Sequence, residues 1–101
     1  MINVLASIQV KPGKMKEFLP ICKANIPNVR QESGCIEYAA TIDVHADLEP
    51  QVLDENMVTV IEKWESLEAL NDHLKAPHML SYREHVKDLV GKVTLKVLQE
   101  A

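Results

Sequence analysis

The side chains best able to do chemistry gather in the C-terminal half of the chain. They are the single tryptophan, two of the four histidines, a methionine, a tyrosine and an arginine: Trp64, His73, His78, Met79, Tyr82 and Arg83. Imidazoles titrate near neutral pH and can accept a proton, whereas a guanidinium stays charged and can stabilise an anion. Aromatic and thioether side chains can form the apolar wall against which a flat ring packs.

Each of these residues also has an ordinary structural explanation. Trp64 would anchor the core at the end of a strand, and His73 would be a partly exposed residue beside an apolar helix stripe. Taken together, however, they place an indole, imidazoles, a phenol and a guanidinium around one space between helices and a sheet. The sequence therefore predicts a pocket in that space.

A metal site is not expected from the histidine spacing. His78 and His85 lie two helical turns apart, about 10 Å by the helix rise, which is too far to share an ion. His73 and His78 flank Pro77, so only a sharp bend would bring them together. We expect no metal ligands.

No motif for an organic cofactor is present either. Gly13, Gly34 and Gly91 are too widely separated to form a nucleotide-binding loop. Cys22 and Cys35 lack metal or redox spacing and are expected to be packed free thiols. The sequence predicts chemistry without a bound cofactor.

Four segments alternate between apolar and polar residues, as half-buried strands do. They cover residues 2–10, 35–42, 56–64 and the end of the chain around Val93, Leu95 and Val97. In the second strand Tyr38 shares a face with Ile36, Ala40 and Ile42. The polar, acidic segment 43–56 is predicted to be an exposed loop.

Apolar residues recur at helical spacing in two further regions. The first runs from Lys14 to Val29 and should bend at Pro20 and Pro27. The second starts after Ser66, with an inner stripe of Leu67, Leu70 and Leu74, and is interrupted by Pro77. Beyond Pro77 the helix should end near Gly91, with one face formed by Met79, Tyr82, Val86 and Leu89.

The predicted order is β-α-β-β-α-β with a broken second helix, which is the order of a ferredoxin-like α+β fold. Residues 1–101 form one domain. Helices then cover one face of an antiparallel sheet, and the other face stays bare. A homodimer through the open sheet face would cover it.

The composition narrows the possible partners. The net charge is -4, and lysines and arginines are dispersed, so no basic surface for nucleic acid is expected. No apolar run is long enough to span a membrane, and no basic segment precedes the first strand. We expect a cytoplasmic protein.

Three segments carry a resemblance to a known family. The run from Lys63 to Met79, the segment Val10–Lys14 and the turn Glu32–Cys35 resemble the antibiotic biosynthesis monooxygenase superfamily. The long loop and the Pro77–Met79 sequence are most similar to its bacterial quinol monooxygenase branch. The resemblance implies a dimeric α/β barrel that oxidises a quinol or related phenolic molecule with O2, without metal or flavin.

Individual positions refine that resemblance. The family's tryptophan matches Trp64, and the pocket arginine of the polyketide-oxidising relatives aligns with Arg83, but their asparagine and tyrosine are replaced by Val60 and Leu70. The heme-degrading relatives carry an asparagine, a tryptophan and a histidine at positions occupied here by Ala6, His73 and Arg83. Heme degradation is therefore disfavoured.

We therefore expect His73, His78 and Arg83 to be catalytic. Arg83 would stabilise a quinolate, and His73 or His78 would accept its proton. The residues expected to bind a small aromatic or quinone-like substrate are Trp64, Tyr82, Met79 and Tyr38. Two alternatives stay open: an isomerase of a small phosphorylated signal molecule, as in a sister branch, and a dimer that only binds a small ligand.

Overall fold

The strand β1 (Ile2–Val10) lies inside the sheet, and the rest of the chain is arranged around it. The computed structural model describes residues 1–101 and contains one antiparallel sheet in the order β2-β3-β1-β4. The other elements are α1 (Met15–Arg30), β2 (Cys35–Ile42), β3 (Met57–Trp64), α2 (Leu67–Lys75), α3 (Pro77–Val86) and β4 (Val90–Leu98). This confirms the predicted ferredoxin-like α+β fold.

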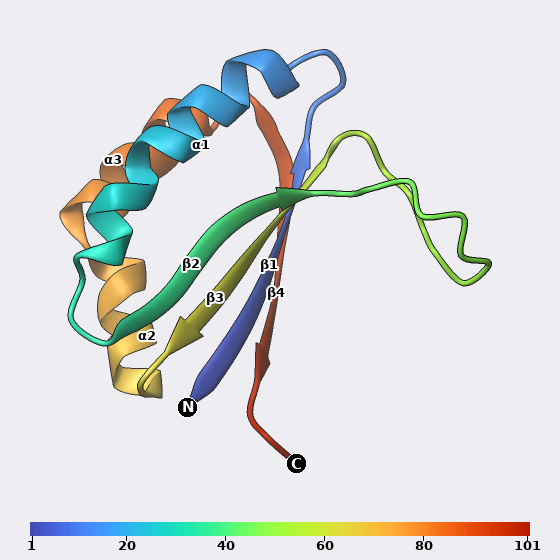
Figure 1. The fold of residues 1–101 in the computed structure, drawn as a ribbon. Coiled ribbons are helices and arrows are strands. Elements are labelled where there is room, and N and C mark those ends of the chain that lie inside the picture. Colours follow the sequence, from blue (N-terminus) through green and yellow to red (C-terminus); the bar gives the residue numbers. More distant parts are fainter.

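The three helices lie on one side of the sheet, to the left in Figure 1, and leave its other side uncovered. Every second residue of β1 is buried beneath them: Ile2, Val4, Ala6, Ile8 and Val10. Directly opposed residues of antiparallel strands point to the same face, so Val60 and Leu95, which flank Ala6, also face the helices. The strand register therefore places one face of β3 and β4 toward the helix layer.

Helix α1 continues through both of its internal prolines. Its inner side is formed by Phe18, Cys22, Asn25 and Val29, which are buried against the sheet and α3. Asn25 is the polar member of this row, and its amide nitrogen lies 3.2 Å from the sulfur of Met79. This contact joins α1 to α3 above the interior of the protein.

The residues of α2 that face the interior differ from the expected apolar stripe. Leu67 is 55% exposed, whereas His73 is only 2% exposed and takes the inner position beside Leu70. The Ser66 hydroxyl accepts a hydrogen bond from the backbone N–H of Ala69, and this cap orients the first turn so that Leu67 points outward. The predictions of an inner Leu67 and a partly exposed His73 were wrong.

The end of the second helical region also differs. Helix α3 ends at Val86, and Gly91 lies within β4 rather than after the helix. Buried Leu89 lies in the turn between them, and its backbone N–H bonds the carbonyl of Val86. Because β1 pairs with β4 from Val90 onward, the helix ends earlier than the position of Gly91 predicted.

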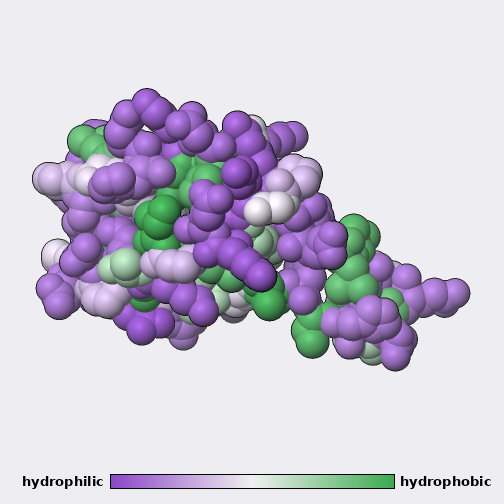
Figure 2. Space-filling model, turned by 90° about the horizontal axis from the view of Figure 1, so that it is seen from above, coloured by the Kyte–Doolittle hydropathy of each residue, from purple (hydrophilic) through white to green (hydrophobic).

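Residues 43–56 form a projecting loop without helix or strand, as predicted. Asp43 helps to close its base by accepting a hydrogen bond from the backbone N–H of Asp54. Figure 2 shows hydrophobic atoms gathered on this projection, where Val44, Leu48 and Val52 are largely exposed. No helix of the structure has both the length and the apolar character needed to cross a membrane.

Candidate functional site

A cavity of about 320 Å³ lies between the sheet and helices α2 and α3. Most of its lining is apolar, and the sheet contributes Ala6, Ile8, Val60, Val93 and Leu95. Val93 and Leu95 are also 55% and 46% exposed, because the helices do not extend over β4. The cavity therefore has an apolar interior and is bordered on one side by the edge strand.

Glu62 is the only carboxylate among the cavity-lining residues. Glu62 is only 5% exposed, and its Oε1 accepts a hydrogen bond of 2.9 Å from the indole Nε1 of Trp64. Burial raises the pKa of Glu62 to about 7, although the bond from Trp64 opposes the shift by favouring the charged form. A carboxylate that titrates near neutral pH inside an apolar cavity is suited to act as a general base.

His73 lies next to Glu62 in the same cavity wall. Its Nε2 is 4.0 Å from Glu62 Oε1, and its ring packs against Trp64 with a centroid distance of 4.6 Å. Burial lowers the pKa of His73, and the adjacent Glu32 carboxylate opposes this shift. The imidazole is therefore favoured in its neutral form at pH 7, and can receive a proton.

Glu32 connects the two predicted histidines. Its Oε2 lies 2.8 Å from Nδ1 of His73 and 2.8 Å from Nε2 of His78. Glu32 lies in the turn between α1 and β2, and the α2–α3 break supplies the sharp bend that sequence analysis required for the two histidines to meet. No group of three or more His, Cys, Asp or Glu side chains is placed to hold a metal ion.

Two cations border the cavity. Arg83 and Lys87 both line the cavity, and both are exposed to solvent. The Arg83 guanidinium donates a hydrogen bond of 2.6 Å to the carbonyl of Leu74, which fixes it beside α2. A positive group held at this border would attract an anionic oxygen of a bound ring.

The phenols of Tyr38 and Tyr82 also line the cavity. Burial raises the pKa of both phenols well above their usual value of 10. Both therefore stay protonated at neutral pH and can donate or accept hydrogen bonds without taking up charge. Tyr38 additionally meets His73 edge to face, with ring centroids 5.5 Å apart.

The cavity brings together five of the seven predicted site residues: Tyr38, His73, Met79, Tyr82 and Arg83. Trp64 does not line it. The indole is fully buried behind His73 and contacts Glu62. The expected apolar wall is therefore formed without Trp64, whose position supports two cavity residues.

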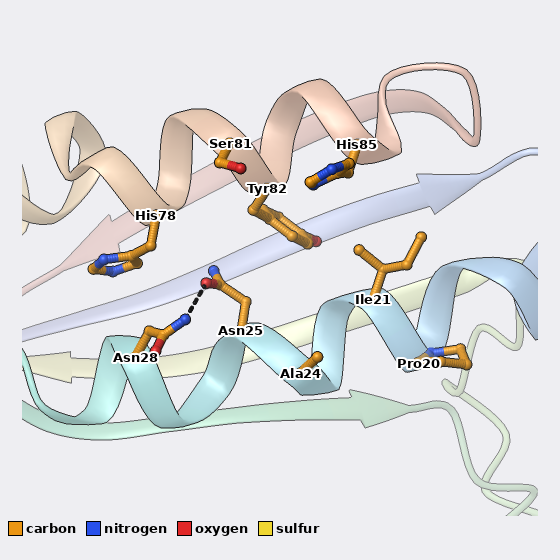
Figure 3. Close-up of a pocket in the computed structure, with 9 residues that line it drawn as sticks. All are labelled: Pro20, Ile21, Ala24, Asn25, Asn28, His78, Ser81, Tyr82 and His85. Carbon is orange, nitrogen blue, oxygen red and sulfur yellow. Dashed lines mark hydrogen bonds between the residues drawn. The ribbon is translucent and has the colours of Figure 1, made fainter.

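His78 also lies outside the cavity, in a surface groove between α1 and α3 (Figure 3). His78 and His85 mark opposite ends of this groove in Figure 3, and Tyr82 lies between them. Tyr82 lines both the groove and the cavity. His78, Tyr82 and His85 thus lie along the flank of α3 that faces α1.

Two carboxylates of the site were missed by sequence analysis. Glu62 has the same strand parity as Val58, Val60 and Trp64, all of which are buried, and a charged residue at an inward position is a usable signal. Glu32 has no comparable signal. It belongs to a turn, and only the fold brings it beside residues more than forty positions away.

Comparison with known proteins relates the whole chain to one family. The family model described as "Antibiotic biosynthesis monooxygenase" matches residues 1–85. "Probable quinol monooxygenase YgiN" of Escherichia coli is 34% identical over 105 residues, which cover 98% of this chain and 97% of the relative.

Solved structures share the fold. Rv0793 from Mycobacterium tuberculosis superposes with a TM-score of 0.82 at 26% identity, over 99% of this chain and 94% of that chain. A crystal structure named as an antibiotic biosynthesis monooxygenase gives a TM-score of 0.83 at 22% identity, over 100% of this chain and 99% of the other.

Proposed function

The chain belongs to the antibiotic biosynthesis monooxygenase family, and we propose that it oxidises a quinol or a related phenolic molecule with O2, without a metal or organic cofactor. The observation that carries this proposal is the position of Glu62, a carboxylate with a pKa near 7 in an otherwise apolar cavity. The name of the relative YgiN as a quinol monooxygenase supports the substrate class.

A quinol needs little from a protein beyond binding, deprotonation and shielding. Removal of a hydroxyl proton makes the ring electron-rich enough to pass an electron to O2. One oxygen atom then enters the ring, and the other leaves as water. The quinol itself supplies the electrons for both events, so a naphthoquinol and O2 give a hydroxynaphthoquinone and water.

The cavity residues divide this work. Glu62 accepts the hydroxyl proton, and His73 beside it then receives that proton from Glu62. The first base is therefore a carboxylate and not one of the histidines expected from the sequence. Arg83 stabilises the quinolate oxygen. The flat ring packs against Met79, Tyr82 and Tyr38, whereas Trp64 holds Glu62 and His73 in position.

Dimerisation through the open sheet face is part of the proposal. That face carries Leu5 opposite Ile61, and the exposed fractions of Ile61 and Leu98 are 43% and 42%. A second copy that covered these side chains would remove apolar surface from water. Sedimentation of wild type and of Ile61→Lys tests this, since the charge should yield monomers if this face is the interface.

The enzymatic proposal is tested with a naphthoquinol as the probe. We expect protein-dependent oxygen uptake above the rate of spontaneous oxidation, and a hydroxylated product in aerobic but not anaerobic samples. A heat-denatured sample controls for autoxidation. Quinone binding without oxygen uptake would favour a ligand-binding dimer, and turnover of a phosphorylated sugar-derived signal would favour the isomerase, although the mainly apolar lining suits a ring better.

A further inference from the structure

We propose that Glu62, His73, Glu32 and His78 form a proton path from the cavity to the groove between α1 and α3. The inference rests on the proposed function, because it explains how the base of that reaction is reset. It assigns positioning and proton-transfer roles to Glu32 and His78, neither of which lines the cavity.

A buried base needs a way to lose its proton. Glu62 is 5% exposed, and after each deprotonation of substrate its carboxyl group is neutral in an apolar space. Bound substrate would block the direct route from the cavity to solvent. A path through the protein would allow Glu62 to release its proton while the cavity is occupied.

The four side chains lie in a row of donors and acceptors. The distances are 4.0 Å from Glu62 Oε1 to His73 Nε2, 2.8 Å from His73 Nδ1 to Glu32 Oε2, and 2.8 Å from Glu32 Oε2 to His78 Nε2. Two of these contacts are already hydrogen bonds, and the first is about 1 Å longer than one. Such contacts often tighten when substrate binds, and a small rotation of the Glu62 carboxyl group would close this gap.

Exposure increases from His73 to His78. The exposed fractions of the side chains are 5% for Glu62, 2% for His73, 13% for Glu32 and 27% for His78. His78 lies at one end of the groove in Figure 3 and faces α1. The path therefore begins in the cavity and reaches solvent at a different surface of the protein.

The proton balance is simple. Glu62–H gives its proton to Nε2 of His73, while Nδ1–H of His73 donates to the Glu32 carboxylate. Glu32–H passes its proton to Nε2 of His78 in the Nδ1–H tautomer, and the imidazolium that forms releases its Nδ1 proton to water in the groove. Each group returns to its starting charge after the tautomers of His73 and His78 reset, so no oxidant or co-reactant is required.

Several other groups set the charge balance of the path. Those facing Glu62 and His73 from the surrounding elements, besides the path residues, are Cys35, Tyr38, Trp64, Arg83 and Lys87. Arg83 opposes a charged His73, whereas Glu32 favours it. Burial and Arg83 therefore favour the return of His73 to its neutral form, by release of a proton to Glu32.

The matched test compares His78→Gln with His85→Gln. Both histidines lie in the groove, at opposite ends in Figure 3, but only His78 contacts Glu32. Turnover of a naphthoquinol is measured at low and at high concentrations of imidazole buffer. Glu32→Gln provides a second variant that weakens both links, and circular dichroism checks the fold of each.

We expect kcat of His78→Gln to fall by about tenfold at low buffer, to recover with added imidazole, and to leave KM unchanged. His85→Gln should behave as wild type. A structural role for His78 would not produce rescue by buffer. Wild-type turnover by His78→Gln at low buffer, or a loss that imidazole does not restore, would overturn the path.

A measurement without substrate separates this inference from the proposed function. In NMR spectra recorded at one pH, Glu62→Gln should change the ring ¹⁵N chemical shifts of His78 and leave those of His85 unchanged, because coupled groups share protons. An unchanged His78 would refute the path even if the enzyme oxidises quinols. A shifted His78 in a protein that turns over no quinol would support the path and refute the proposed reaction.

Discussion

Trp64 and Glu62 lie two positions apart on β3 and are joined by a hydrogen bond of 2.9 Å between the indole Nε1 and Oε1. Both face the helix layer, but only Glu62 reaches the cavity. The bond holds the carboxyl group in position and favours its charged form, whereas burial disfavours that form. The balance leaves the pKa of Glu62 where a base for neutral-pH chemistry should have it.

The first prediction concerns the pH dependence of activity. If Glu62 must be ionised to accept a proton, kcat/KM for a naphthoquinol should rise as pH increases through about 7. Glu62→Gln should lower kcat/KM by roughly a hundredfold or more, since it removes the base. Initial rates across the pH range measure both effects.

The matched control for this experiment is Glu65→Gln, an exposed carboxylate just beyond the same strand. It should keep both the rate and the midpoint of the wild-type profile. A wild-type profile without a transition near neutral pH would argue against Glu62 as the base.

The second prediction concerns stability. The pKa of Glu62 is raised from 4.5 to about 7 in the folded protein, so the folded state holds this proton more tightly than the unfolded state. The resulting stabilisation is present below pH 4.5 and is lost as pH rises through about 7, a change of about 3 kcal/mol at most. Glu62→Gln should therefore gain stability relative to wild type at pH 8 but not at pH 5.

Urea unfolding of both proteins at the two pH values measures this difference. The glutamine keeps an oxygen that accepts the bond from Trp64, so the comparison isolates ionisation. An equal difference between variant and wild type at both pH values would contradict the raised pKa.

The third prediction concerns Trp64. Trp64→Phe keeps an aromatic ring against His73 but removes the donor to Glu62. Loss of this bond to the charged form should raise the pKa of Glu62 further and shift the midpoint of the kcat/KM profile upward by roughly one pH unit. A lower rate with an unchanged midpoint would show that Trp64 only packs against His73 and does not affect the pKa of Glu62.

The fourth prediction concerns the turn that carries Glu32. Gly34 has a φ of +85°, and a Cβ there would lie 2.6 Å from the Cβ of Ala69 on α2. Gly13 has a similar φ of +77° but open space around it. Gly13→Ala should cost about 1 kcal/mol from backbone strain alone, and Gly34→Ala should cost roughly 1 to 3 kcal/mol more from overpacking.

Denaturant unfolding of the two variants gives these values. Because Gly34 lies two residues after Glu32, we also expect Gly34→Ala to weaken the contacts of Glu32 with the two histidines. Equal losses for the two glycine variants would show that α2 yields to the added methyl group.

The fifth prediction concerns the cation at the cavity border. Arg83→Met keeps a long apolar stem but removes the charge that would face a quinolate. It should lower kcat/KM by about tenfold to a hundredfold, because one charge-assisted contact is lost. Lys75→Met, on the exposed side of α2, is the control and should leave kcat/KM unchanged.

Sequence periodicity predicted the strands well, most clearly β1. Every second residue of β1 is buried, and the residues paired with them on β3 and β4 point to the same face. The inward-facing side of α2 and the end of α3 were harder to predict. A serine cap rotated the first turn of α2, and strand pairing with β1 set the end of α3.

The site was predictable to the extent that its residues lie close together in sequence. Met79, Tyr82 and Arg83 all lie on α3, and their spacing along this helix allows all three to line the cavity. The link from His73 to His78 depends on Glu32, a residue of a distant turn, and no local pattern indicates that contact. Long-range polar contacts of this kind emerge only from the assembled fold.

The central claim is most directly tested by labelling with ¹⁸O2. Wild-type protein and Glu62→Gln are each mixed with a naphthoquinol under ¹⁸O2, and the product is analysed by mass spectrometry. We predict that wild type forms a hydroxynaphthoquinone that carries one labelled oxygen atom, and that Glu62→Gln forms little above the protein-free background. An unlabelled product, or equal labelling with and without protein, would contradict the assignment of this chain as a quinol monooxygenase.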